Sequence, residues 1–151
     1  MLTAHDVMTE DPVTIPMMAK VRDAIRTLHR LDVRHLPVVD EDGSLVGMLS
    51  DRDLRAFSFP EMIGAEFLGT VQAALDAPIS SIMTSDVATV GVESDVAEII
   101  DMMIDLKIGA VPVVDTDGTL VGIVSYIDLL RELSVEDEPR ARGRETASPK
   151  N

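Results

Sequence analysis

The order of apolar and polar residues along the chain predicts short strands that alternate with amphipathic helices. Residues 13–15 (Val-Thr-Ile) are mostly β-branched, which favours a strand. The apolar residues that follow are spaced three and four apart, which predicts a helix; they are Val21, Ala24, Ile25, Leu28 and Leu31. The continuous apolar run 36–39 is typical of a buried strand. Asp42-Gly43 is a tight hairpin signal before a return strand at 45–49, and a second helix begins after Ser50.

The same pattern occurs again 75 residues later, without a gap. At this offset LPVVD at 36–40 matches VPVVD at 111–115, and Asp-Gly at 42–43 matches Asp-Gly at 117–118. LVG at 45–47 matches LVG at 120–122, and Ser50 and Asp53 match Ser125 and Asp128. We therefore predict an α+β fold with two β-α-β-β-α repeats, one at residues 4–57 and one at residues 79–133.

The segments outside the two repeats have a different composition. Residues 58–78 form a linker, in which a helix is expected over 61–75 after Pro60. Residues 134–151 mix acidic and basic residues and hold no large apolar residue beyond Val135, so we expect a flexible tail.

Composition and charge exclude several classes of function. The 151 residues contain no Cys, which rules out disulfides, thiolate metal sites and cysteine nucleophiles. The formal net charge of −14 repels nucleic-acid polymers and anionic membrane surfaces at long range. No apolar run approaches the ~20 residues needed to span a bilayer, and the first residues do not form a signal peptide. We therefore expect a cytoplasmic protein.

Four features occur in both repeats: an opening Met-Thr, an apolar-Pro-Val-Val-Asp strand, an Asp-Gly hairpin and a Gly-x-x-Ser-x-x-Asp motif. The last motif covers residues 47–53 and 122–128. In this order and twice over, they resemble the cystathionine-β-synthase (CBS) domain, and the tandem resembles a stand-alone CBS pair, or Bateman module. The resemblance implies a pseudo-two-fold pair with two clefts that often hold adenine nucleotides. It also implies that two pairs associate into a flat disc, so we expect a homodimer.

Ser50 and Asp53 are spaced so that both side chains lie at the first turn of a helix. A carboxylate can accept hydrogen bonds from both hydroxyl groups of a ribose, which suits a nucleotide site. The alternative is that Ser-x-x-Asp forms only a helix-capping box.

Basic residues distinguish the first repeat from the second. Arg34, His35 and Arg52 have no basic counterpart in repeat two, and in family members that bind phosphorylated nucleotides such positions often carry basic residues. The alternative is that these are surface charges and a packed histidine. Residues 1–56 hold seven basic and ten acidic residues, whereas residues 78–133 hold two and ten. We therefore expect phosphorylated adenosine ligands to prefer the cleft that contains Asp53.

Two sets of binding residues follow from the resemblance, with apolar members that could flank adenine or belong to the core. The first set is expected around Asp53: Arg34, His35, Pro37, Ser50, Arg52, Asp53, Ala88 and Ile108. The second set is expected at a weaker site around Asp128: Val13, Val33, Gly109, Ala110, Pro112, Ser125 and Asp128.

The sequence gives little support for calcium binding, other metal binding or catalysis. The acidic hairpins have their Gly too early for a calcium loop, and the three His lack metal-ligand spacing. Nothing provides an oxyanion hole for a Ser50, His35 and Asp53 arrangement. We therefore expect a non-catalytic regulatory sensor of AMP, ADP or ATP without an obligatory cofactor or metal, acting on an unknown regulated protein. The alternative is a ligand-free interaction or dimerisation module.

Overall fold

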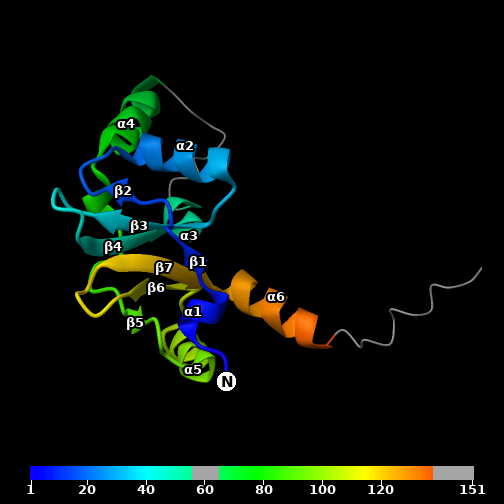
Figure 1. Cartoon of the computed structure of the whole chain (residues 1–151). Helices are drawn as coiled ribbons and strands as arrows, with labels where there is room; N and C mark the ends of the chain where they lie inside the picture. Colours follow the sequence, from blue (N-terminus) through cyan, green and yellow to red (C-terminus); the bar gives the residue numbers. More distant parts are fainter. Residues whose placement is uncertain (56–64, 138–151) are drawn as a thin grey trace, which may run out of the picture.

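The computed structural model of the chain describes residues 1–55 and 65–137. Two sheets lie next to each other at the centre, and most helices lie on the outer sides (Figure 1). The first sheet contains β2 (Ile15–Pro16), β3 (His35–Val39) and β4 (Leu45–Ser50). The second contains, in spatial order, β1 (Thr9–Glu10), β7 (Leu120–Ser125), β6 (Ala110–Val114) and β5 (Val90–Gly91). The predicted α+β class with two repeats is confirmed.

Six α-helices and one 3₁₀-helix complete the described part of the chain. They are α1 (Ala4–Val7), α2 (Val21–Leu31), α3 (Asp51–Arg55), α4 (Ala65–Asp76), η1 (Ile79–Ser81), α5 (Val96–Leu106) and α6 (Tyr126–Asp137). α2 and α4 lie beyond the first sheet, and α1 and α5 lie beyond the second (Figure 1). No helix in residues 1–55 and 65–137 is long and apolar enough to cross a membrane.

The two hairpins have the same register at an offset of 75 residues. His35 lies opposite Ser50 in β3–β4, and Ala110 lies opposite Ser125 in β6–β7. Both turns place a glycine in the left-handed region, with φ of 82° at Gly43 and 83° at Gly118. A side chain is strained at this φ, so Asp-Gly suits both turns.

Each repeat completes its sheet with a segment from the other repeat. β1 precedes repeat one's first strand, yet it pairs antiparallel with β7 of repeat two. Reciprocally, Thr84 forms a bridge with Met48 on β4. A Cβ atom on Gly47 would lie 2.5 Å from the Sδ of Met83, and one on Gly122 would collide with Met8. The two glycines therefore leave room for these methionine side chains, one from each repeat.

The apolar core forms two clusters, one at each sheet. The first includes Ala24, Leu28, Leu36, Leu49 and Ile79. The second includes Ile99, Met103, Val111, Val113 and Val124. Not every apolar residue of the predicted α2 stripe is buried, because Ile25 is 37% and Leu31 39% exposed.

Three predicted boundaries differ from the structure. The strand expected at 13–15 begins only at Ile15, and its counterpart only at Val90, because pairing to β3 and β6 starts there. The linker helix is α4, Ala65–Asp76, and its expected start at Pro60 lies outside the described residues. α6 continues to Asp137, so residues 134–137 of the expected tail are helical.

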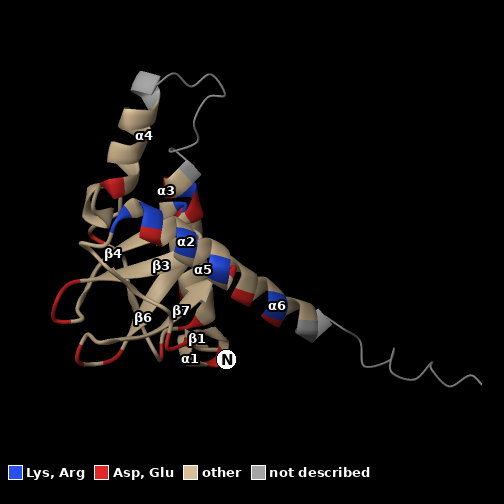
Figure 2. Ribbon diagram, turned by 90° about the horizontal axis from the view of Figure 1, so that it is seen from above, with Lys and Arg blue, Asp and Glu red and all other residues tan. Residues whose placement is uncertain are grey.

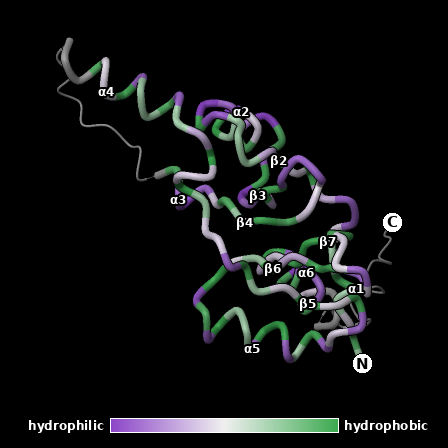
Figure 3. The backbone as a smooth tube through the Cα atoms, turned by 90° about the vertical axis from the view of Figure 1, so that its left-hand side faces the viewer, coloured by the Kyte–Doolittle hydropathy of each residue, from purple (hydrophilic) through white to green (hydrophobic). Residues whose placement is uncertain are grey.

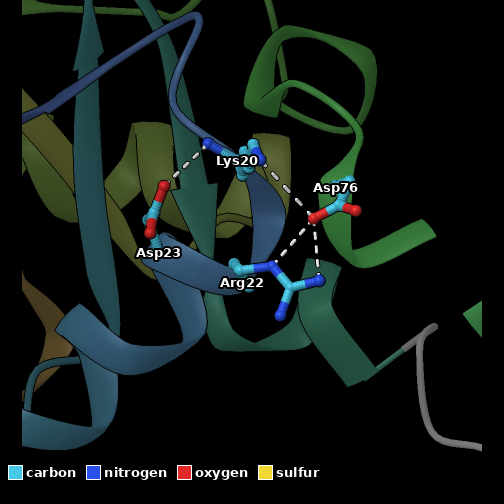
Figure 4. Close-up of polar contacts among 4 residues, drawn as sticks. All are labelled: Lys20, Arg22, Asp23 and Asp76. Atoms are coloured by element: carbon cyan, nitrogen blue, oxygen red, sulfur yellow. Dashed lines mark hydrogen bonds and ion pairs between the residues drawn. The ribbon is translucent and has the colours of Figure 1, made fainter. Parts of the chain in front are cut away.

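Ion pairs join α4 to the start of α2 (Figure 4). Asp76 Oδ1 accepts hydrogen bonds from Arg22, with Nε at 2.9 Å and Nη2 at 2.7 Å, and Lys20 Nζ lies 3.7 Å away. The hydrogen bond from Arg22 lowers the pKa of Asp76, because it favours the ionised carboxylate. The linker helix is therefore held to repeat one.

Candidate ligand-binding clefts

Two cavities lie where the repeats meet. The Asp53 cleft has a volume of about 730 Å³, within the range of ~300–1,000 Å³ typical of small-molecule sites. Both repeats line it. Repeat one contributes Arg34, His35, Met48, Ser50, Asp51, Arg52 and Asp53, and the later part of the chain contributes Thr84, Asp86, Val87, Ala88, Leu106, Lys107, Ile108, Gly109, Ala110 and Tyr126.

The Asp128 cleft is smaller, at about 450 Å³. It too is composite, and its lining residues are Thr9, Asp11, Pro12, Val13, Asp32, Val33, Arg34, His35, Ile123, Ser125, Tyr126, Ile127, Asp128 and Arg131. Arg34, His35 and Tyr126 line both cavities, so the two clefts are neighbours.

Ser50 and Asp53 form a capping box at the start of α3. Asp53 Oδ2 accepts hydrogen bonds from Ser50 N at 2.8 Å and Ser50 Oγ at 3.1 Å, and Ser50 Oγ accepts one from Asp53 N at 3.3 Å. Ser125 and Asp128 repeat this arrangement at 2.9, 3.0 and 3.3 Å. These bonds use Oδ2, so the cap fixes the orientation of a carboxylate whose other oxygen is Oδ1. Capping and ligand binding are therefore compatible roles.

The Asp128 carboxylate differs from that of Asp53 because it accepts a further hydrogen bond from a threonine. Thr9 Oγ1 donates a hydrogen bond of 3.4 Å to Asp128 Oδ1. Thr9 belongs to the N-terminal segment that crosses to repeat two, so the crossing brings a hydroxyl to this cleft.

Positive charge is unevenly divided between the cavities. Arg34, Arg52 and Lys107 line the Asp53 cleft against three aspartates, Asp51, Asp53 and Asp86. Arg34 and Arg131 line the Asp128 cleft, also against three aspartates, Asp11, Asp32 and Asp128. The Asp53 cleft is thus the less acidic of the two.

A small cluster separates the clefts. Arg34 Nη1 donates a hydrogen bond of 2.6 Å to Tyr126 Oη. A Cβ on Gly109 would lie 3.1 Å from His35 Nε2 and 3.5 Å from Tyr126 Cδ1, so the imidazole and the phenol ring flank the Gly109 backbone. The equivalents of Arg34 and Tyr126 are Gly109 and Asp51, so repeat symmetry does not produce a second such bond.

Burial lowers the pKa of His35 below 6.5, because desolvation disfavours the imidazolium form. Asp51 and Asp53 oppose this effect, and Arg34 adds to it. His35 is therefore mainly neutral at pH 7, and an anion placed beside it would favour its protonation.

Most of the predicted binding residues lie in the cleft to which they were assigned. The Asp53 cleft contains Arg34, His35, Ser50, Arg52, Asp53, Ala88 and Ile108, and the Asp128 cleft contains Val13, Val33, Ser125 and Asp128. Gly109 and Ala110 were assigned to the Asp128 cleft. They line the Asp53 cleft instead, because the start of β6 faces the cavity that contains Asp53. Pro37 and Pro112 are fully buried within their strands and line neither cavity.

Several lining residues were not predicted. Lys107, one of the two basic residues counted in repeat two, adds a cation to the Asp53 cleft that we had not assigned to it. It ends α5 with a φ of 57°, just as Asp32 ends α2 with a φ of 53°, so the repeat places both side chains equivalently. Thr9 and Thr84 are the threonines of the repeated Met-Thr pair, a signal that could have marked them.

The geometry offers no support for nucleophilic catalysis by Ser50. Its hydroxyl donates to the Asp53 carboxylate rather than to an imidazole, so it lacks the base that activates a serine. Within residues 1–55 and 65–137 no group of three or more His, Asp or Glu side chains is placed to hold a metal ion.

Comparison with known proteins adds independent information. The model of the CBS domain family matches residues 4–59 and 79–135. An uncharacterised 33.4 kDa protein encoded in a ribosomal RNA operon of Thermofilum pendens is 40% identical over 115 residues. That match covers 74% of this chain and 38% of the relative, so the chain spans well under half of its length.

Solved structures share the fold. CBSX2 of Arabidopsis thaliana in complex with AMP has a TM-score of 0.74 at 27% identity, covering 90% of this chain and 99% of that one. The CBS domain pair of protein MJ0100, in complex with 5′-methylthioadenosine and S-adenosyl-L-methionine, has a TM-score of 0.73 at 27% identity. There the shares are 90% of this chain and 98% of the other.

Proposed function

The chain belongs to the CBS domain family, and from this premise we propose that it is a non-catalytic regulatory module that binds an adenosine nucleotide of the AMP, ADP or ATP class. Structural neighbours are complexes with AMP and with 5′-methylthioadenosine and S-adenosyl-L-methionine, so the adenosine group is the shared feature of their ligands. The proposal assigns the preferred site to the Asp53 cleft.

One observation carries this assignment: a fixed carboxylate and three cations line the same cavity. Asp53 is oriented by the cap at Ser50, so it needs little reorganisation to accept hydrogen bonds from ribose hydroxyls. Arg34, Arg52 and Lys107 supply the positive charge that phosphate groups require.

The apolar part of the ligand also has a place in this cleft. Ala88, Ile108 and Met48 of β4 line it, and their side chains give apolar contact area for a planar base. Gly109 also lines this cleft, and the His35 imidazole packs against its backbone. We assign adenine to this side and the phosphates to the arginines.

The Asp128 cleft is proposed as the weaker site. It is smaller and has one cation fewer, and Thr9 already occupies Asp128 Oδ1 with a hydrogen bond. Val13 and Val33 line it, so a less charged adenosine compound fits it better than a nucleotide with several phosphates.

Regulation would follow from the composite nature of the clefts. A ligand that contacts both repeats favours the arrangement in which those contacts are made, and so shifts the population toward it. The proposal includes a homodimer and an unidentified regulated protein as receivers of this change, and a cytoplasmic location, which suits a chain without Cys.

A ligand panel tests the proposal. Adenosine, AMP, ADP, ATP, 5′-methylthioadenosine and S-adenosyl-L-methionine are added separately to the full chain, with GMP as the control, and the Tm is measured. A ligand at 100 times its Kd stabilises the native state by about 2.7 kcal/mol, which gives a readily measured rise in Tm. A rise with AMP, ADP or ATP that GMP does not match is the expected result. No rise with any adenosine compound would instead favour the ligand-free interaction module.

A further inference from the structure

The two clefts are lined by equivalent positions of the two repeats. With the exception of Arg131, every residue that lines the Asp128 cleft corresponds, at the offset of 75 residues, to a residue that lines the Asp53 cleft. The clefts can therefore be compared position by position. A difference in the ligands that they accept comes from the positions at which their side chains differ.

One equivalent pair reverses the sign of its charge. Asp32 lines the Asp128 cleft, whereas its equivalent Lys107 lines the Asp53 cleft. Among the matched lining residues of the described chain, no other pair sets an acidic residue against a basic one. Two pairs keep an aspartate in both clefts; they are Asp11 with Asp86 and Asp128 with Asp53.

The backbone holds Asp32 and Lys107 in the same way. Asp32 ends α2 with φ 53° and ψ 43°, and Lys107 ends α5 with φ 57° and ψ 44°. Both lie in the left-handed region, which few residues other than glycine adopt. The two side chains therefore leave equivalent backbones in the same direction, and what differs between them is their length and their charge.

Both charges are available to a ligand. The side chains of Asp32 and Lys107 are exposed. The ion pairs within residues 1–55 and 65–137 are His5–Glu10, Lys20–Asp76 and Arg22–Asp76. In these parts of the chain, therefore, neither Asp32 nor Lys107 has a charged partner. A charged group on a ligand in the cleft lies within the ~8 Å over which such a charge acts at physiological salt.

The repeats differ in their polar residues more than in their cores. The tube of α2 shows more hydrophilic positions than that of α5 (Figure 3), yet the equivalent residues Leu28 and Met103 of these helices are both buried. The reversal between Asp32 and Lys107 is the part of this divergence that changes the sign of a charge inside the clefts.

We propose that residues 32 and 107 select the ligands of the two clefts by charge. Lys107 favours a phosphate group in the Asp53 cleft. Asp32 disfavours a phosphate group in the Asp128 cleft and favours an adenosine compound with a positively charged 5′ substituent. This inference rests on the proposed binding of adenosine compounds and deepens it, because it names the residues that separate the two classes of ligand.

The arginines of the Asp128 cleft do not cancel this selection. Arg34 lines both clefts and already donates a hydrogen bond to Tyr126, so it does not distinguish them. Arg131 is the other cation of the Asp128 cleft, where three aspartates leave an excess of negative charge.

In the Asp53 cleft, Arg52 takes the position that Ile127 holds in the Asp128 cleft. It acts in the same direction as Lys107, because both add positive charge to the Asp53 cleft alone.

Three ligands that differ only at the 5′ position isolate the effect of charge. They are AMP, adenosine and 5′-amino-5′-deoxyadenosine, whose amine is protonated at pH 7. Each is titrated into the methyl-labelled full chain at low salt and followed by NMR. The methyl groups of Val33 report on the Asp128 cleft and those of Ile108 on the Asp53 cleft, since each residue lines one cavity only. The ratio of the AMP Kd to the adenosine Kd then measures the selection in each cleft.

Exchanging the two residues tests the proposal. Asp32→Lys should lower this ratio about tenfold at Val33, and Lys107→Asp should raise it about tenfold at Ile108, because each variant changes the local charge by two units. The preference for the amine should change in the opposite direction. Each variant introduces a residue that the other repeat carries at the same φ and ψ, so the fold should be kept, which circular dichroism checks.

Asp42→Lys is the matched control, because it makes the same change of charge outside both cavities. Asp42 lies in the β3–β4 turn, and the acidic turns of the hairpins lie at the opposite end of the molecule from α6 (Figure 2). The length of β3 places this turn roughly 16 Å from His35 at the clefts, which exceeds the Debye length. Both ratios should therefore stay within about twofold of those of the wild type.

The possible outcomes separate this inference from the proposed function. In the wild type, the Asp128 cleft should bind the amine at least as tightly as adenosine, and AMP more weakly than adenosine. Binding of adenosine with ratios that neither exchange alters beyond Asp42→Lys would overturn the charge selection and leave the proposed adenosine site standing. Failure of the amine to bind at Val33 would overturn the assignment of a cationic ligand to the Asp128 cleft. If none of the three compounds binds in either cleft, both proposals are overturned.

Discussion

Arg34 and Tyr126 are hydrogen-bonded across the two repeats, with 2.6 Å between Nη1 and Oη. Both residues line both clefts, so the guanidinium that a phosphate in either cleft would bind is held by the other repeat in the free protein. A phosphate that binds Arg34 must compete with the Tyr126 hydroxyl group for the guanidinium. One arginine between two cavities also means that phosphorylated ligands in both cavities would compete for it.

Tyr126→Phe should therefore strengthen binding of phosphorylated ligand. The ring remains, but the acceptor for Arg34 is lost, so we expect the Kd for AMP to fall about three- to tenfold, as for a hydrogen bond worth ~1 kcal/mol. Isothermal titration calorimetry of AMP on wild type and variant measures this. Adenosine is the control ligand, because it has no phosphate. An equal gain for adenosine, or weaker AMP binding, would count against Arg34 as a phosphate ligand.

The close approach of the two repeats at Gly47 sets a second expectation. In Gly47→Ala the new Cβ would meet Met83 Sδ at 2.5 Å and the Thr84 carbonyl oxygen at 3.0 Å. Overpacking of this kind costs about 1–3 kcal/mol, which chemical denaturation measures as a lower free energy of unfolding.

Gly69→Ala is the matched control for that substitution. Gly69 lies inside α4 with nothing within 4 Å of its Cβ position, so alanine there should stabilise the chain by about 0.5–1 kcal/mol. Equal effects at the two positions would mean that the methionine contact does not constrain the pair.

The pH dependence of stability should reflect His35. Its folded pKa lies below 6.5, so the unfolded chain binds more protons between the two values, and stability rises with pH through that window. The contribution is fully present above about pH 6.5 and is lost as the pH falls toward the folded value.

Removal of the imidazole isolates this contribution. His35→Asn should flatten the dependence of the free energy of unfolding on pH in the window below about pH 6.5. His29→Asn removes an exposed histidine and serves as the comparison. If the two variants change the slope equally, burial of His35 is not its cause.

The ion pairs of Asp76 predict a titration shift. Arg22→Gln removes the hydrogen bond that chiefly lowers the Asp76 pKa, so that pKa should rise in the variant. Carboxyl chemical shifts followed by NMR against pH measure the change directly. An unchanged Asp76 titration would show that α4 is not held by Arg22 in solution.

The repeat explains why so much of the fold was predictable from the sequence. The two repeats align at an offset of 75 residues without a gap, so the prediction of each strand, hairpin and helix in one repeat is supported by the other. In the structure, the registers of β3–β4 and β6–β7 agree at every equivalent pair. The two cores followed from the same apolar periodicities. The crossing of β1 to β7 did not, because apolar periodicity identifies a buried face and not the strand that pairs with it.

The residues of the two clefts were predictable only where a repeated sequence motif marks them. Ser50, Asp53, Ser125 and Asp128 came from their motif, and the structure places them as two capped carboxylates. Lys107 and Arg131 carry no motif, and only the packing of one repeat on the other brings them to a cleft. Gly109 was placed in the wrong cleft for the same reason: sequence spacing does not say which repeat a strand end faces.

The most direct test of the account is calorimetric titration of AMP into wild type, Asp53→Asn and Asp128→Asn. Asparagine keeps an acceptor for the cap and removes the charge, so the fold is preserved while the ribose contact weakens. Loss of a charge-assisted hydrogen bond of ~1.5–3 kcal/mol predicts a Kd for AMP about ten to a hundred times higher in Asp53→Asn, with the tight site of Asp128→Asn unchanged. Loss of AMP binding in Asp128→Asn, with Asp53→Asn like wild type, would contradict the assignment of the nucleotide to the Asp53 cleft.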